Sequence, residues 1–157
     1  MGHSAGAQMA ALVCTDDSYL KAEKLSLSIL KGCVPLDCSF YDIPKRVKDG
    51  GETPPATIKE IFTDKEETQK EYSAVAHIAK GKSIPPFLIL HVASRADTKA
   101  QAHWLADKLK EAGVSANVVA AEGKTHGTIN SDLGKPDDTP TKAVFEFLDR
   151  VQKETKP

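Results

Sequence analysis

The residues of this sequence that are best suited to chemistry lie at its start. Gly2-His3-Ser4-Ala5-Gly6 has the pattern Gly-x-Ser-x-Gly, which places a serine on a strained turn between a strand and a helix, with its hydroxyl exposed. Such a serine can attack a carbonyl carbon when a nearby base takes its proton. The bare pattern is a weak signal, because a chance match in a chain of this length is roughly a 5% event. The plain alternative is that Ser4 is a small residue at a helix N-cap.

Two further candidates, a carboxylate and a histidine, each follow an expected strand. The apolar run Phe87–Val92 predicts a strand buried on both faces, and Asp97 lies in the loop that we expect after it. The run 114–121 predicts the next strand, and His126 lies in the loop after that one. The carboxyl ends of parallel strands meet at one edge of a sheet, where such proteins gather their functional groups. The spacing therefore places both side chains at one edge.

The rest of the chain supplies elements that can position these groups. The small-residue run Ala5–Thr15 predicts a helix directly after Ser4, and Pro35 and Asp37 weaken a strand expected over 33–38. Further helices are expected over 18–31 (one or two short ones), 56–62, 65–71, 98–112 and 141–153. Strands that alternate with helices of this length predict a single α/β domain over 1–157 with a mainly parallel sheet.

Three segments resemble the esterase and lipase branch of the α/β-hydrolase superfamily. They are GHSAG followed by AQMAALV, then PPFLILHVASRADTKAQAHWLADKLKEAGV, and finally GKTHGTINSDLGKPDDTPTKAVFEFL. The sequence is close to carboxylesterases related to hormone-sensitive lipase and to kynurenine formamidase-like hydrolases, and the resemblance covers essentially the whole chain. The fold it implies is an α/β-hydrolase fold.

The resemblance also implies roles for individual residues. It makes Ser4 the nucleophile, His126 the base and Asp97 the acid that orients the base. The backbone N–H of Ala5 is then an oxyanion donor. The elbow glycines are Gly2 and Gly6. The family can also carry its acid slightly earlier in the loop, but Ser94 and Arg95 occupy those places, and neither is an acid. The reaction implied is two-step acyl transfer on esters of short acyl chains, with no metal or other cofactor.

The sequence departs from the family at its start. The family carries a long segment before the elbow, which supplies the early strands and a His-Gly-Gly loop that completes the oxyanion hole. We therefore expect a truncated form of the fold, the C-terminal portion of a larger domain, with residues 39–83 as a cap or lid. Loss of one oxyanion donor lowers the rate by about 10²–10³, so this chain is expected to be a weak catalyst. An exposed sheet edge favours pairing with another chain, so we also expect a homo-oligomer.

Composition excludes several other classes of protein. The chain has 157 residues, and 21 Lys and Arg face 22 Asp and Glu, which leaves no field to attract nucleic acid. No apolar run approaches the roughly 20 residues that a membrane-spanning helix needs. Three cysteines argue against a disulfide scaffold, and their spacing does not suit zinc. The remaining alternatives are an amide or formamide hydrolase, and a non-catalytic module whose triad is a relic.

Overall fold

The computed structural model describes residues 1–50 and 56–153, and its centre is a parallel sheet. The strands β1 (Gly2–His3), β2 (Pro35–Leu36), β3 (Phe87–Val92) and β4 (Ala116–Ala121) lie side by side in chain order. Every neighbouring pair is parallel. The carboxyl ends of all four strands therefore meet at one edge, and this edge carries the candidate site.

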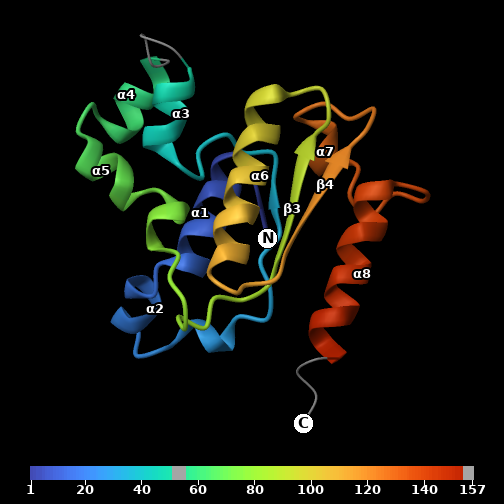
Figure 1. Cartoon of the computed structure of the whole chain (residues 1–157). Helices are drawn as coiled ribbons and strands as arrows, with labels where there is room; N and C mark the ends of the chain where they lie inside the picture. Colours follow the sequence, from blue (N-terminus) through green and yellow to red (C-terminus); the bar gives the residue numbers. More distant parts are fainter. Residues whose placement is uncertain (51–55, 154–157) are drawn as a thin grey trace.

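Helices cover both faces of the sheet (Figure 1). The side chains of β3 alternate between the two faces and all of them are buried, which is why the strand is apolar except for His91. Phe87 and Ile89 pack with α1 (Ala5–Thr15) and α6 (Ala96–Glu111). Leu88 and Leu90 pack with α8 (Thr139–Lys153) on the opposite face. The predicted α/β architecture with a strand buried on both faces is confirmed.

Shorter helices fill the connections. They are α2 (Ser18–Ala22), α3 (Ile43–Asp49), α4 (Ala56–Phe62), α5 (Glu66–Glu71) and α7 (Thr128–Ser131), with short 3-10 turns η1 (Leu27–Ile29) and η2 (Ala74–His77). Helices α3, α4 and α5 lie together at the upper left of Figure 1, toward the end at which β3 finishes. Among the described residues, no helix is long and apolar enough to cross a membrane.

Most element bounds follow the sequence pattern, and the departures have local causes. The expected strand over 33–38 is reduced to β2, because Asp37 adopts φ 50° and so turns the chain out of extended geometry. Helix α6 starts at Ala96 rather than at Thr98, so Asp97 lies in its first turn. Strand β1 pairs with β2 and leads the chain into the serine turn.

Candidate active site

Ser4 sits on a strained turn between β1 and α1. Its backbone has φ 57° and ψ −122°, a combination that a residue with a side chain rarely adopts and that packing must impose. The Ser4 N–H donates to the carbonyl of Leu36 at 3.0 Å, which ties the turn to β2. A side chain at Gly2 would collide with the backbone carbonyl of Gly6, so this glycine is required. A side chain at Gly6 would meet open space, so only Gly2 makes room for the turn.

The start of α1 lies beside the Ser4 hydroxyl. The carbonyl of Ser4 accepts from the N–H groups of Ala7 and Gln8, at 3.0 and 3.3 Å. Within the described part of the chain, no hydrogen bond occupies the N–H of Ala5. This N–H and the positive end of the helix dipole are therefore free to act on a negative oxygen next to Ser4.

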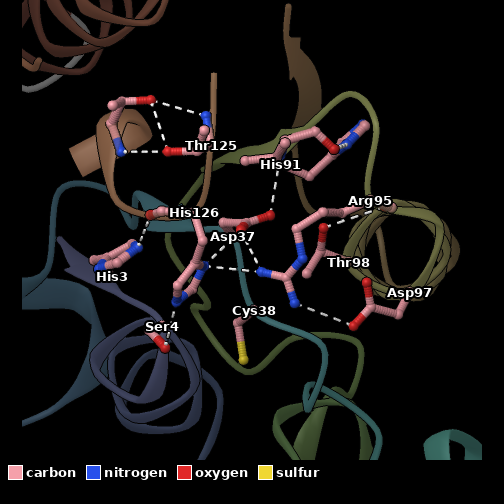
Figure 2. A network of polar contacts seen from close by, with 12 residues as sticks. His3, Ser4, Asp37, Cys38, His91, Arg95, Asp97, Thr98, Thr125 and His126 are labelled. Carbon is pink, nitrogen blue, oxygen red and sulfur yellow. Dashed lines mark hydrogen bonds and ion pairs between the residues drawn. The ribbon is translucent and has the colours of Figure 1, made fainter. Parts of the chain in front are cut away.

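His126 joins Ser4 to a buried carboxylate (Figure 2). Its Nε2 lies 3.0 Å from Ser4 Oγ, and its Nδ1 lies 2.7 Å from Asp37 Oδ2. His3 holds the loop of His126 in place, because its Nε2–H donates to the backbone carbonyl of His126 at 2.7 Å. The two imidazole rings also pack with their centroids 4.5 Å apart. The ring of His126 thus has a defined position between a hydroxyl and a carboxylate.

Asp37 is the carboxylate at this position, directly after β2. Its side chain has no exposed surface, and its Oδ1 accepts from the Val92 N–H at 2.9 Å. Burial alone would raise the pKa of Asp37. Polar contacts with Thr98, Val92, His126 and Arg95 outweigh burial and hold that pKa below its ordinary value. Asp37 is therefore ionised at neutral pH and can accept a hydrogen bond from the Nδ1–H of His126.

The predicted acid, Asp97, does not lie against His126, and the structure corrects this expectation. Because α6 begins at Ala96, Asp97 is already within the helix and lies on the far side of Arg95. Its carboxylate accepts from Arg95 Nη2 at 3.2 Å and lies 3.9 Å from Arg46 Nη2. Within the described residues, Asp97 is thus connected to the site through the guanidinium of Arg95.

Sequence reasoning missed Asp37, although a signal for it was present. Asp97 and Asp37 each follow a strand at the carboxyl edge of the sheet. The local pattern marks Asp37 only as a residue that weakens the strand over 33–38. The rule that an acid can follow any strand of the sheet would have kept both carboxylates as candidates.

Cys38 is the other side chain near Ser4 with nucleophilic chemistry (Figure 2). Burial raises the pKa of Cys38 to about 12, and the negative charge of Asp37 adds to this effect. The thiol is therefore protonated at neutral pH, and a protonated thiol is a poor nucleophile. In the described residues, no three His, Cys, Asp or Glu side chains are placed to hold a metal ion.

Known structures resemble this fold over nearly its whole length. A native esterase, Est2 of the planctomycete Thermogutta terrifontis, matches 98% of the chain at 23% identity with a TM-score of 0.62. Its butyrate-bound form matches at 25% identity with a TM-score of 0.63. EstE5, soaked by p-nitrophenyl butyrate, matches 98% of the chain at 16% identity and 0.64. The match covers 53%, 54% and 51% of those chains, so this chain spans about half their length.

These similarities define the fold class. The chain has the α/β-hydrolase fold of these structures, over about half of their length. A scan against protein-family models gave no match, and a search of curated proteins gave none.

Proposed function

We propose that this chain is a serine hydrolase that cleaves carboxylic esters of short acyl chains through an acyl-enzyme. The observation that carries the proposal is the continuous contact from Ser4 Oγ through His126 to Asp37, at 3.0 and 2.7 Å. A serine on a strained turn, a histidine in reach and a buried carboxylate behind it are the parts that activate a hydroxyl for acyl transfer.

The proposed reaction has two steps, acylation of Ser4 and hydrolysis of the acyl-serine. Ser4 Oγ bonds to the ester carbonyl carbon while its proton passes to His126 Nε2. Asp37 accepts a hydrogen bond from Nδ1–H and stabilises the imidazolium, and the Ala5 N–H stabilises the oxyanion. As the tetrahedral intermediate collapses, the C–O bond to the alcohol breaks and the alcohol leaves with the proton from His126. Water then attacks the acyl-serine by the same route, giving the carboxylic acid and free Ser4.

The similar structures support the choice of substrate class. Est2, which is named as an esterase, has been solved with butyrate bound, and EstE5 has been solved after soaking with p-nitrophenyl butyrate. We extend this substrate class to the present chain. In the proposed site the backbone N–H of Ala5 supplies one oxyanion donor.

We propose that residues 39–83 form a cap over this site; residues 51–55 of this range lie outside the described part of the chain. Helix α3 lies at the carboxyl end of the sheet, where Arg46 approaches Asp97. Asp42 at the start of α3 is held by α6, since Trp104 Nε1 donates to its carboxylate at 2.8 Å. A segment anchored in this way can form a wall beside the acyl or the alcohol part of the substrate.

Hydrolysis of p-nitrophenyl acetate tests the proposal. We expect the wild-type chain to exceed the rate of Ser4→Ala, and Ser131→Ala, an exposed serine of α7, to match the wild type. Equal rates for wild type and Ser4→Ala would show that the chain is a non-catalytic module with a relic triad.

A further inference from the structure

Arg95 makes a contact that the proposed triad does not need. Its Nη1 lies 2.6 Å from Asp37 Oδ2 and 2.8 Å from His126 Nδ1 (Figure 2). Arginine only donates hydrogen bonds. His126 Nδ1 can therefore either donate its own hydrogen to Asp37 or accept one from Arg95, but not both. The distances of 2.7 and 2.8 Å permit either arrangement.

The two arrangements differ in whether the base can work. When Nδ1 carries the hydrogen and donates to Asp37, Nε2 has a free lone pair that can take the Ser4 proton. When Nδ1 accepts from Arg95, neutral imidazole carries its hydrogen on Nε2, and that nitrogen cannot take a proton from Ser4. Arg95 and Asp37 thus favour opposite tautomers of His126.

We propose that Arg95 is a positioning residue that restrains the triad, because it competes with Asp37 for Nδ1 of His126 and favours the unreactive tautomer. This inference rests on the proposed function. The positive charge of Arg95 acts in the same direction, since it offsets the charge of Asp37 that would stabilise the imidazolium.

Arg95 is not required to hold the carboxylate in place. Asp37 is fully buried, and its Oδ1 is fixed by the Val92 N–H at 2.9 Å. Removing the guanidinium therefore leaves Oδ2 aimed at His126, whose backbone is held independently by His3. The expected effect of removing Arg95 is a gain in activity rather than a loss.

Asp97 opposes this restraint from the other side. Its carboxylate binds Arg95 Nη2 at 3.2 Å, which draws the guanidinium away from His126 and offsets its charge. Removing the charge of Asp97 leaves Arg95 free to settle on Nδ1. Substitutions at these two positions should therefore change activity in opposite directions.

Other ionisable groups near His126 come from each element packed against it. They are His3 of β1, Asp37 and Cys38 after β2, and Arg95 and Asp97 at the start of α6. His91 of β3 is buried and turns its ring toward His103 instead. The lowered pKa of Asp37 and the raised pKa of Cys38 keep both groups in one charge state from about pH 5 to 9. His3 is the remaining ionisable side chain that packs against the ring of His126.

The first test is the pH dependence of kcat/KM for the wild type, Arg95→Met and Asp97→Asn, from about pH 5 to 9. Methionine keeps much of the length of arginine without a charge or a donor. We expect Arg95→Met to raise the alkaline plateau about fivefold, the value of one ordinary hydrogen bond. In Arg95→Met the acidic limb of the pH profile should also shift to higher pH by about one unit. In Asp97→Asn the plateau should fall and the acidic limb should shift to lower pH. A plateau that falls in Arg95→Met, or a limb that does not move, would overturn the inference.

The second test does not depend on activity, so it separates this inference from the proposed function. Nitrogen-15 spectra of labelled histidine report which ring nitrogen carries the hydrogen, and they resolve His126 from His3. We expect a larger share of the Nδ1–H tautomer of His126 in Arg95→Met than in the wild type. The same tautomer balance in both proteins would refute the role of Arg95, even if Ser4-dependent turnover is observed. Absence of turnover with a shifted balance would refute only the proposed function.

Discussion

Replacing Asp37 by asparagine removes the charge behind His126 with little change in shape, and the surrounding contacts dictate how the new amide sits. The Val92 N–H needs an acceptor at the position of Oδ1. The amide oxygen must therefore face Val92, and the NH₂ group takes the place of Oδ2, 2.7 Å from His126 Nδ1.

This orientation forces His126 into the wrong tautomer. The new NH₂ group donates to Nδ1, so Nε2 carries the hydrogen and points it at Ser4, where a base is required. The Nη1 group of Arg95 loses Oδ2 as its acceptor, and a hydrogen bond from this group to Nδ1 would favour the same tautomer. A wrong tautomer together with a lost negative charge lowers kcat by about 10⁴ in triads of this kind. We expect a loss of this order for Asp37→Asn.

The assay is hydrolysis of p-nitrophenyl butyrate, with the rate of Ser4→Ala subtracted and circular dichroism used to confirm folding. Asp97→Asn is the matched control, because the same chemical change is made at a carboxylate that touches Arg95 rather than His126. We expect Asp97→Asn to lose less than about tenfold. A loss in Asp97→Asn as large as in Asp37→Asn, or an Asp37→Asn loss below tenfold, would refute the reasoning about the acid.

Further predictions concern stability and association. Gly2→Ala puts a methyl group against the carbonyl of Gly6, so we expect a loss of about 2 kcal/mol in urea unfolding. Gly6→Ala, which meets open space, should change little, and similar losses in both would contradict the turn geometry. The pKa of Asp37 is lowered in the folded chain, so its stabilisation is complete above about pH 4 and declines as pH falls through the lowered value. The difference in free energy of unfolding between wild type and Asp37→Asn should therefore become smaller below about pH 4. A difference that does not change with pH would contradict the lowered pKa of Asp37. Strand β1 lies at the edge of the sheet, and Met9 of α1 is 63% exposed, so we predict that the chain self-associates. Light scattering should show the association, and Met9→Lys should weaken it. A wild-type chain that stays monomeric at high concentration would contradict this prediction.

The sequence predicts the fold well where one local pattern dominates. Helix Ala5–Thr15 and strand Phe87–Val92 have the predicted bounds, because the small-residue run and the apolar run agree with their tertiary surroundings. The strand at Pro35–Leu36 is shorter than predicted, because the left-handed backbone of Asp37 ends it. That backbone angle depends on the contacts of Asp37 with Val92 and His126, which are distant in sequence.

The site was predictable in part for the same reason. The Ser4 turn and the His126 loop follow from local motifs, and the structure brings the two side chains into contact. The choice between Asp37 and Asp97 could not be made locally, since each follows a strand at the same sheet edge. It is decided by the point at which α6 starts, which puts Arg95 between Asp97 and the histidine.

Covalent capture of the Ser4 hydroxyl shows whether Ser4 is a nucleophile activated by His126. A structural relative, esterase 2 of Thermogutta terrifontis, has been solved phosphonylated by sarin. A fluorophosphonate probe followed by peptide mass spectrometry should place one adduct on Ser4 of this chain. That adduct should be absent in Ser4→Ala and form far more slowly in His126→Ala. No adduct on the wild type, or equal labelling of Ser4→Ala, would contradict the account.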